Sequence, residues 1–511
     1  MSSLRVQGWR PLKAVLGGLV DVPESLEVSD LTQDSRSVTP GAAFLACRGG
    51  THHGVEFAAA AAAAGARAIL WEPGAGIQAP SVDASVLVRA VPNLRAQLGF
   101  IADRFFDAPS ASLTVAGITG TNGKTTCAWL LAQALEYSGR RAAYVGTLGG
   151  GGIHDLTDFG TTTPDAVTLH RLLARLRAQG FTAVAMEVSS HGLDQDRCAG
   201  VRFHTAVFTN LTRDHLDYHA DMAAYGAAKA RLFEWPTLKV RVINVDDPFG
   251  LELAQTARRG AAAAQLLLTS QRPSEWLASG TDYVCARAVT ARDTGLTIEI
   301  ESSRGNARLT SRLLGDFNVD NLLTVLAVLL AWDLSLSEAC AALSRCSAPP
   351  GRMQPEGGGG KLPLVLIDYS HTPDALAKAL HAARAHCRGR LHCVFGCGGD
   401  RDPGKRGEMG RIAAQDADLL VVTDDNPRSE DPAVITDAIL QGIAQADGLS
   451  RARVIHDRAL AIRSALAAAS VDDVVLVAGK GHEEYQIVGA ERRVFSDTEA
   501  VRAALSQWGG A

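Results

Sequence analysis

A group of glycines followed by a lysine and two threonines is the strongest chemical pattern in the sequence. It ends the segment Val115-Ala-Gly-Ile-Thr-Gly-Thr-Asn-Gly-Lys-Thr-Thr126, whose first half is mostly apolar. Glycines permit tight turns that aim backbone N–H groups at an anion, and the N-terminus of a following helix favours negative charge. The segment therefore predicts a strand, a phosphate-binding loop and a helix, in that order.

The side chains of this loop suit a nucleotide and its metal ion. Lys124 would reach the β- and γ-phosphates, and the Thr125 hydroxyl would reach Mg²⁺. A strict Walker A pattern requires glycine at position 118, where the chain has Ile118. A glycine-rich turn with a chance lysine is the alternative interpretation. The nucleotide-binding residues that we expect in the loop are Gly120, Thr121, Asn122, Gly123, Lys124 and Thr125.

Further along the chain, acidic and histidine side chains follow two apolar runs. Glu187 ends the run Ala183-Val-Ala-Met-Glu187, where phosphate-loop enzymes commonly place a magnesium ligand or a water-orienting acid. The next run ends in a segment that contains Asp214, His215, Asp217 and His219. This density suggests an ion site, and a solvated acidic loop is the alternative that spacing alone leaves open.

One lysine and one cluster of histidines and cysteines are more simply interpreted as structural residues than as functional ones. Lys229 lies four residues after Tyr225 on a predicted helix, and this spacing alone favours an ordinary exposed lysine. A second group fits no paired Cys-x-x-Cys metal motif, so we expect buried free thiols there rather than a metal site. Its members are His386, Cys387, His392, Cys393 and Cys397.

Composition excludes several classes of protein. The chain has 511 residues, of which 47% are hydrophobic and 21% charged, and its net charge is −5. These values fit a globular protein of several domains and argue against nucleic acid as the main partner. Nine scattered cysteines suit a reducing compartment, so we expect a cytoplasmic protein. No apolar run is long enough to span a membrane, so we expect no membrane insertion.

Alternating strand and helix patterns predict an α/β protein of three domains. We expect a small α/β domain over 1–108, a central domain over 109–346 and a C-terminal domain over 347–511. The central domain should hold a parallel sheet with helices on both faces. Its expected strands are 113–118, 142–147, 183–188, 205–209 and 240–245, and the apolar segment 318–332 predicts a buried helix.

The C-terminal segment has the pattern of a Rossmann-like domain with one ligand site. Expected strands cover 364–367, 391–395, 419–422 and 474–477, and each is followed by a polar or glycine-rich string. The glycines at 357–360 indicate a hairpin tip before the first of them. Open α/β sheets bind ligands beyond the carboxyl ends of their strands, so the four strings point to one site.

Together these segments resemble the Mur ligase family, the ATP-dependent amide-forming enzymes of peptidoglycan precursor synthesis. The resemblance covers nearly the whole chain. It rests on Gly120–Thr126, Glu187–Gly192, Asp214–Asp217, Gly315–Asn321, Gly351–Arg352 and Asp368–Asp374, which occur in the family order. Ser370 stands where the family more often has alanine. The family loop also accounts for Ile118, because it differs from Walker A at that position.

Within the family, the chain resembles the members that add meso-diaminopimelate to UDP-N-acetylmuramoyl-L-alanyl-D-glutamate. Members that add lysine usually lack an arginine at the position of Arg428. Diaminopimelate differs from lysine by a second amino-acid head, and a guanidinium can bind that carboxylate through two parallel hydrogen bonds. The resemblance implies an amine-binding site made of Arg401, Asp425, Asn426, Pro427, Arg428, Gly479 and Glu483, with Glu483 facing the ammonium.

The resemblance also assigns the other expected site residues. It implies that Lys229 is carbamylated by CO₂, so that it becomes an anion able to ligate or orient Mg²⁺. Lys124, Glu187, His215 and carbamylated Lys229 would be catalytic, and the metal ligands would be Thr125, Glu187, His215 and Lys229. Asn318, Arg352 and Asp368 would complete the ATP site. The UDP-sugar and its peptide would be bound by Ser35, Thr51, His52, His53, Thr162, Thr163, Ser189, Gln195 and Arg197.

The implied reaction is an ATP-dependent amide synthesis through an acyl phosphate. ATP would phosphorylate the D-glutamate side-chain carboxylate, and the amine of diaminopimelate would then attack it. Within the superfamily, a lysine-adding enzyme or a folylpolyglutamate synthase-like ligase is the alternative. Outside it, the alternatives are a phosphate-loop nucleotide switch and a non-catalytic nucleotide-sugar binder.

Overall fold

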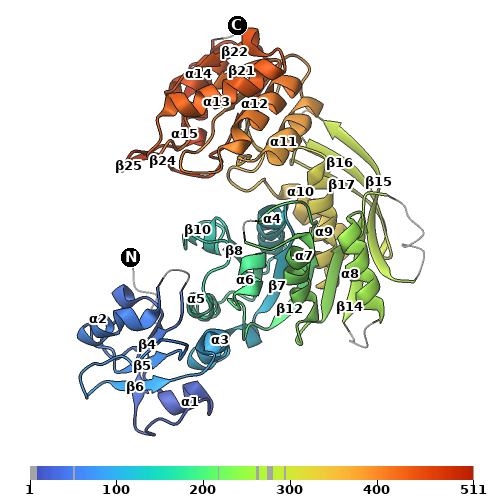
Figure 1. Ribbon diagram of the computed structural model, residues 1–511. Coiled ribbons are helices and arrows are strands. Elements are labelled where there is room, and N and C mark those ends of the chain that lie inside the picture. The colour runs from blue at the N-terminus through green and yellow to red at the C-terminus, as the bar shows by residue number, and fades with distance from the viewer. Residues whose placement is uncertain are drawn as a thin grey trace. The chain divides into compact units, whose positions relative to one another are not determined.

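The computed structural model describes residues 8–49, 52–216, 218–259, 264–272, 280–292 and 295–509 (Figure 1). The chain divides into two compact units, 1–268 and 269–511. The domain limits that we expect at 108 and 346 stay a prediction.

The first unit begins with a small parallel sheet. Its strand order is β3-β4-β5-β6, and all of its pairings are parallel. Helix α3 contributes Leu94, Leu98 and Ile101 to the core beneath this sheet. The elements of this part are β1 (Arg10–Pro11), α1 (Leu12–Leu16), β2 (Glu27–Val28), β3 (Leu31–Thr32), β4 (Ala43–Ala46), α2 (Ala58–Ala63), β5 (Ala68–Trp71), β6 (Leu87–Ala90) and α3 (Leu94–Phe105).

A larger sheet forms the rest of the first unit. Its strands lie in the order β10-β9-β8-β11-β7-β12-β13, and β8, β11, β7, β12 and β13 run parallel. The five strands predicted for the central domain are confirmed to within two residues at each end. They are β7 (Thr114–Thr119), β8 (Ala142–Gly146), β11 (Ala183–Glu187), β12 (Phe203–Phe208) and β13 (Val240–Asn244). A glycine hairpin, β9 (Gly149–Gly152) with β10 (Asp155–Thr157), extends the sheet beyond β8.

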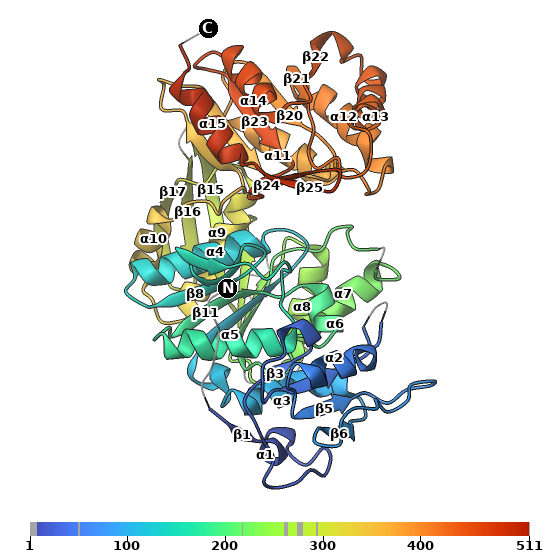
Figure 2. The same ribbon diagram turned by 90° about the vertical axis from the view of Figure 1, so that its left-hand side faces the viewer.

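Helices cover both faces of this sheet, as the alternating pattern predicts. Figure 2 shows α4 (Lys124–Tyr137) and α5 (Ala166–Ala178) on opposite sides of β8 and β11. Helix α4 is buried on almost every side chain from Thr125 to Leu135, which matches its apolar sequence. The remaining helices of the sheet are α6 (Ser190–Asp194), α7 (Met222–Ala230) and α8 (Pro248–Arg259).

The second unit begins with an antiparallel ladder that the sequence pattern did not predict. Strand β14 (Gln265–Ser270) carries the chain across the boundary between units. Strands β15 (Asp282–Arg292), β16 (Gly295–Ser302) and β17 (Gly305–Ser311) then pair in sequence order. Helix α9 (Phe317–Ala331) is buried at nearly all positions, which confirms the prediction for 318–332. Helix α10 (Leu336–Arg345) follows it.

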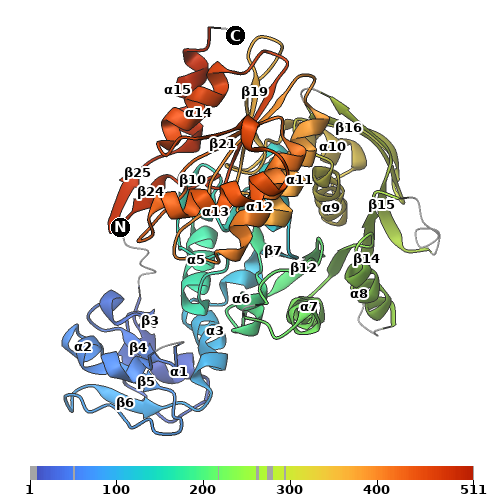
Figure 3. The ribbon, with the colours of Figure 1, turned by 45° about the horizontal axis from the view of Figure 1, so that its top comes forward.

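The C-terminal sheet has the order β18-β19-β23-β20-β21-β22, and it is parallel except at β18. Figure 3 labels two of its strands, β19 and β21. Its four predicted strands are confirmed, and the glycines at 357–360 form the turn between antiparallel β18 and β19. The strands are β18 (Gln354–Gly357), β19 (Leu364–Asp368), β20 (Leu391–Phe395), β21 (Leu419–Val422), β22 (Ala452–Val454) and β23 (Val474–Ala478). The helices are α11 (Pro373–Ala385), α12 (Gly404–Asp416), α13 (Pro432–Gln445), α14 (Arg458–Ala467) and α15 (Asp497–Ser506).

In the part of the chain that the structure describes, no helix combines the length and the apolar character needed to cross a membrane. The nine cysteines all lie in that part and all carry free thiols. Cys393 and Cys397 are buried, as expected, and burial raises the pKa of the Cys397 thiol to about 12.

A fully buried ion pair joins α14 to α15. Arg458 donates to both carboxylate oxygens of Asp497, over 2.7 and 2.8 Å, and neither side chain is exposed. Removing one partner leaves an uncompensated buried charge, so Asp497→Ala should lower the free energy of unfolding by about 3–5 kcal/mol. Urea unfolding followed by circular dichroism measures this change. Asp374→Ala is the control, because it breaks the exposed pair with Lys378 and should cost at most about 1 kcal/mol. Equal losses in the two variants would contradict the assignment.

Candidate active site

The phosphate loop lies between the end of β7 and the start of α4. Gly123 is the N-cap of α4 with φ of 84°, and Gly120 has φ of 147°. A Cβ atom at position 120 would lie 1.9 Å from Thr209 Oγ1, so only glycine fits there. The loop is fixed to the end of β12, because Thr121 N donates to Asn210 O over 2.8 Å and Asn122 N donates to Asn210 Oδ1 over 2.9 Å.

Two lysines converge on one carbonyl of this loop. Lys124 Nζ donates to Gly120 O over 2.9 Å and to Thr121 O over 2.8 Å. Lys229 Nζ also donates to Gly120 O, over 2.7 Å, and it lies 4.3 Å from the centre of the Tyr225 ring. Only 1% of Lys229 is exposed, so the interpretation of an ordinary surface lysine is wrong. Burial, and then the positive charge of Lys124, lower the pKa of Lys229 well below its usual value.

Glu187 is fully buried beside the start of α4 and receives several hydrogen bonds. The parallel register sets Glu187 opposite Ile118, at the last position of strand β11. Thr125 Oγ1 donates to Glu187 Oε2 over 3.0 Å, and Thr147 N donates to Oε1 over 2.9 Å. The Tyr144 hydroxyl donates to Oε1 as well. Sequence reasoning missed Tyr144 and Thr147, which come from β8 and the turn after it.

The loop that follows β12 carries the residues expected to form an ion site. Asp214 and His215 are both exposed, and His215 Nε2 lies 3.6 Å from Asp214 Oδ2. The His215 ring lies 5.9 Å from the Tyr225 ring, which links it to Lys229. Asp217 is outside the described residues, and the described residues contain no group of three His, Cys, Asp or Glu side chains placed to hold a metal.

The residues expected to bind the muramoyl peptide form one network around the backbone of Glu187. Thr163 Oγ1 donates to Glu187 O over 3.1 Å and accepts from Ser189 N over 3.0 Å. Arg197 Nη1 donates to Thr163 O over 2.9 Å, and Arg197 also donates to Gln195 Oε1. The hydroxyl groups of Thr162 and Thr147 are 3.1 Å apart. The structure therefore brings all five of these predicted residues together with Glu187.

The residues expected at the nucleotide end of the UDP-sugar lie in the segments that follow β3 and β4 of the first sheet. Ser35 begins a short helix (Ser35–Ser37), and His53 caps another (Gly54–Phe57), with both short helices packed against α2. His53 is buried, whereas His52 is exposed and lies 3.0 Å from Glu56. Thr51 lies outside the described residues.

Three residues expected to contact ATP lie in the second unit. Asn318 is buried in α9 and donates to Leu314 O over 2.7 Å. The Arg352 guanidinium lies 4.7 Å from the centre of the Tyr369 ring. Asp368 accepts from Met353 N over 2.7 Å and from the Ser370 hydroxyl, and burial raises the pKa of its carboxyl. The Ser370 hydroxyl thus contacts Asp368, one of the residues expected to bind ATP.

The expected amine site surrounds Arg428, which has a left-handed backbone conformation and lies in the loop after β21. Arg428 has φ of 52°, an uncommon value for a residue with a side chain. Two backbone hydrogen bonds hold it in place, to Ile487 O over 3.0 Å and from Gly489 N over 2.7 Å. Its Nη1 donates to Gly399 O over 2.7 Å. A Cβ at Gly398 would lie 2.9 Å from Arg428 Nη1 and 3.8 Å from Arg401 Cγ, so both arginines border this loop.

Behind Arg428 lies a buried polar cluster. Asn426 Nδ2 donates to Glu483 Oε2 over 2.9 Å, and Lys480 Nζ donates to the same Oε2 over 3.0 Å. A Cβ at Gly479 would lie 2.5 Å from Asp425 Oδ2, and one at Gly399 would lie 1.9 Å from Pro427 O. Burial raises the pKa of the Asp425 carboxyl. The seven predicted amine-site residues therefore border one loop cluster, which also contains Lys480.

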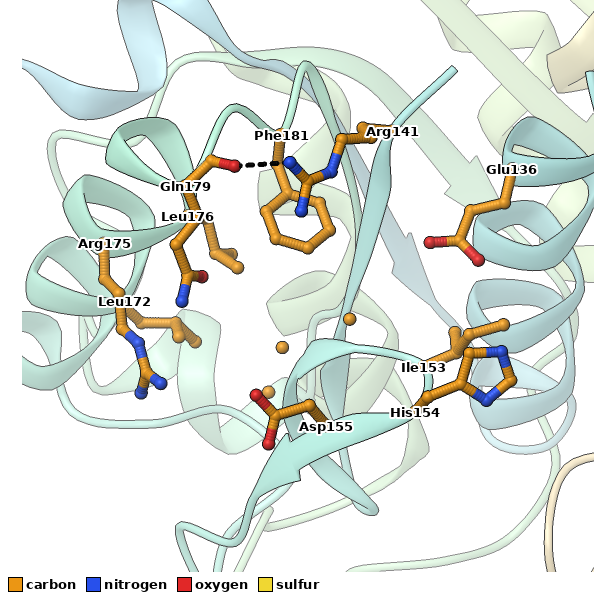
Figure 4. A pocket seen from close by; sticks show the side chains of 13 residues that line it. Glu136, Arg141, Ile153, His154, Asp155, Leu172, Arg175, Leu176, Gln179 and Phe181 are labelled. Carbon is orange, nitrogen blue, oxygen red and sulfur yellow. Dashed lines mark hydrogen bonds between the residues drawn. The ribbon is translucent and has the colours of Figure 1, made fainter. Parts of the chain in front are cut away.

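A separate pocket of about 350 Å³ lies in the first unit (Figure 4). It exists because Gly150 and Gly152 carry no side chain beside Leu172 and Phe181. Arg141 closes one end, where it donates to Gln179 O over 2.7 Å (Figure 4). None of the predicted site residues lines it, so it is not part of the site described above.

Three family profiles match the chain in succession. They are "Mur ligase family, catalytic domain" over 27–106, "Mur ligase middle domain" over 118–329 and "Mur ligase, glutamate ligase domain" over 351–481. Two curated relatives are both UDP-N-acetylmuramoyl-L-alanyl-D-glutamate--2,6-diaminopimelate ligases. The one from Xylella fastidiosa is 47% identical over 96% of each chain, and the one from Chromobacterium violaceum is 48% identical over 95% of each.

A solved structure with the same enzyme name has a TM-score of 0.71 and is 34% identical to this chain. The match covers 98% of this chain and 99% of the other, so both units have counterparts in it. The sequence profiles, the curated relatives and this structure agree along nearly the whole length: the chain belongs to the Mur ligase family.

Proposed function

We propose that the protein is the ATP-dependent ligase that joins meso-diaminopimelate to UDP-N-acetylmuramoyl-L-alanyl-D-glutamate in peptidoglycan precursor synthesis. The observation that carries this proposal is the pairing of two sites. One is a phosphate loop with a buried second lysine on Gly120 O, and the other is the loop cluster around Arg428. The near full-length similarity to ligases of that name supports the choice of substrates.

At the loop, the protein acts mainly by positioning and charge. The backbone N–H groups at the start of α4 and the Lys124 ammonium bind the β- and γ-phosphates of ATP, and they stabilise the negative charge that grows on the transferred oxygens. Lys124 must exchange its bonds to Gly120 O and Thr121 O for phosphate oxygens. Transfer to the glutamate carboxylate gives an acyl phosphate, and attack by the amine then forms the amide and releases phosphate.

The residues around Glu187 fit a magnesium ion. The Thr125 hydroxyl and the Glu187 carboxylate are oxygen donors of the kind Mg²⁺ prefers, and they lie 3.0 Å apart beside the loop. Bound Mg²⁺ would neutralise phosphate charge. His215 remains a proposed further ligand. A carbamate on Lys229 would add a second anion, and the lowered pKa of Lys229 favours the neutral amine that reacts with CO₂.

The loop cluster around Arg428 suits a substrate with a carboxylate at its distal end. Arg428 is held by Gly399 O through Nη1, so its remaining N–H groups can bind that carboxylate. Arg401 on the same loop cluster adds a second cation, and Glu483 offers an anion to the ammonium. Lysine lacks the carboxylate and would leave these donors unpaired, which disfavours the lysine-adding alternative.

The UDP-muramoyl dipeptide is assigned to the first unit. Arg197 and the Thr163 network would bind its peptide, and the loops that carry Ser35 and His52 would bind its uridine diphosphate. We place the reaction in the cytoplasm, because nine free thiols suit a reducing compartment. A nucleotide switch or a passive nucleotide-sugar binder would need no amine pocket, and a folylpolyglutamate synthase-like ligase would need no UDP site.

One assay tests the reaction. Phosphate release is measured with ATP, the UDP-muramoyl dipeptide and either meso-diaminopimelate, L-lysine or no amine. We expect release to depend on the amine, with a preference for diaminopimelate over lysine of at least about 10³-fold in kcat/KM. Amine-independent release would favour a nucleotide switch, and a preference for lysine would contradict the proposed substrate.

The role of Lys229 can be tested separately. Lys229→Ala should lower kcat by at least about 10²-fold, because it removes the carbamate anion that would ligate or orient Mg²⁺ beside the transferring phosphate. Acetate or formate should restore part of the activity, and the exposed Lys239→Ala should behave like wild type. Labelling of the wild type with ¹³C-bicarbonate should weaken as the pH falls, since protonation of Lys229 removes the reactive amine. Full activity of Lys229→Ala would contradict the role.

Tyr144 should orient Glu187. Tyr144→Phe keeps the ring and removes one of the donors to that carboxylate, so we expect kcat to fall about tenfold and the Mg²⁺ concentration for half-maximal activity to rise. Steady-state kinetics over a magnesium titration measures both changes. Tyr137→Phe on the exposed face of α4 is the matched control. Unchanged magnesium dependence in Tyr144→Phe would exclude this role.

A further inference from the structure

A fully buried lysine lies behind the proposed amine site and has no part in the function proposed above. Lys480 directly follows Gly479 after β23, and its side chain has no exposed surface. Its Nζ donates to Glu483 Oε2 over 3.0 Å and to Asn426 Oδ1 over 3.2 Å. A buried ammonium is retained only where its N–H groups are satisfied, and here two of its acceptors belong to amine-site residues.

The hydrogen bonds of the Asn426 side chain can be counted. Its carbonyl oxygen has two lone pairs, and these accept from Ile487 N over 2.9 Å and from Lys480 Nζ over 3.2 Å. Its amide nitrogen has two hydrogens, and one of them is donated to Glu483 Oε2 over 2.9 Å. The capacity that remains for a ligand is a single N–H donor.

The orientation of this amide is fixed by its neighbours. A lysine ammonium and a backbone N–H can only donate, so both require the oxygen of Asn426 to face them. An ionised carboxylate can only accept, so Glu483 requires the nitrogen. Without Lys480 one of these three constraints is lost, together with the charge that balances Glu483.

We propose that Lys480 is a specificity-determining positioning residue for the distal carboxylate of the amine substrate. This inference rests on the proposed function. Lys480 locks Asn426 so that its spare N–H, together with the Arg428 guanidinium two residues later, forms a donor-only receptor for a carboxylate. Lys480 is one of the two donors to the Asn426 oxygen and the cation beside Glu483, so its loss weakens the hold on the amide that presents this N–H. L-lysine has no carboxylate at that end and does not depend on this orientation.

The test compares two amines in the full-length enzyme. Lys480→Met keeps the length of the side chain and removes its donors, and Lys480→Gln is a polar second variant that decides the question if the methionine variant does not fold. We expect the ratio of kcat/KM for meso-diaminopimelate to kcat/KM for L-lysine to fall about tenfold or more. A change of this size is what the loss of one hydrogen bond to a charged group produces. KM for ATP should not change.

A double-mutant cycle shows whether the effect passes through Asn426. In an Asn426→Ala background, Lys480→Met should change the amine ratio little, because the side chain through which Lys480 acts is gone. Lys378→Met is the control for loss of a lysine from the same unit, since its ammonium pairs with Asp374 at the surface. It should keep the wild-type ratio. Thermal unfolding of each variant establishes that it is folded.

The outcomes separate the inference from the function on which it rests. If a folded Lys480 variant keeps the wild-type ratio of kcat/KM for the two amines, whether or not its activity falls, the inference is wrong. The ligase function proposed for the wild type is not affected by that result. A fully additive cycle also overturns it. If the wild type does not use meso-diaminopimelate at all, the proposed function fails and the inference fails with it.

Discussion

The parallel pairing of β7 with β11 and β12 is the constraint on which the active site depends. Parallel strands bring their carboxyl ends to one edge of the sheet, and here that edge holds the phosphate loop, Glu187 and Asn210. A shift of one residue in register would turn Glu187 to the other face and remove its bond with Thr125. The glycine at 146 belongs to the same constraint, because a Cβ there would lie 2.1 Å from Glu187 Oε1.

Much of this could be predicted from the sequence, because the signals are local. The phosphate loop, the central strands and the polar strings after the C-terminal strands each follow from glycine placement and apolar periodicity over a few residues. The family resemblance then assigned roles that spacing could not. For Lys229, spacing predicted an ordinary exposed lysine, whereas the resemblance implied a carbamylated lysine of the active site. The burial of Lys229 depends on how α7 packs beside Gly120, which no local pattern records.

What the sequence did not reveal are contacts between strands that are distant in the chain. Tyr144 and Thr147 reach Glu187 only because β8 lies beside β11, and a tyrosine in an apolar strand otherwise reads as core. Lys480 was visible as part of a polar string, but its partner Asn426 follows a different strand. The ladder β15–β17 was missed because its alternating polar residues look like a surface segment until the pairing is known.

The two buried lysines of the site regions show how surroundings decide chemistry. Lys480 has a carboxylate at 3.0 Å and a side-chain amide oxygen, so its positive charge is balanced where it lies. Lys229 donates to a neutral carbonyl that it shares with another cation, Lys124. Placing two positive charges on one carbonyl is unfavourable in a buried site, and loss of the Lys229 proton relieves it. These surroundings support the proposals that Lys229 reacts as an amine and that Lys480 acts as a fixed cation.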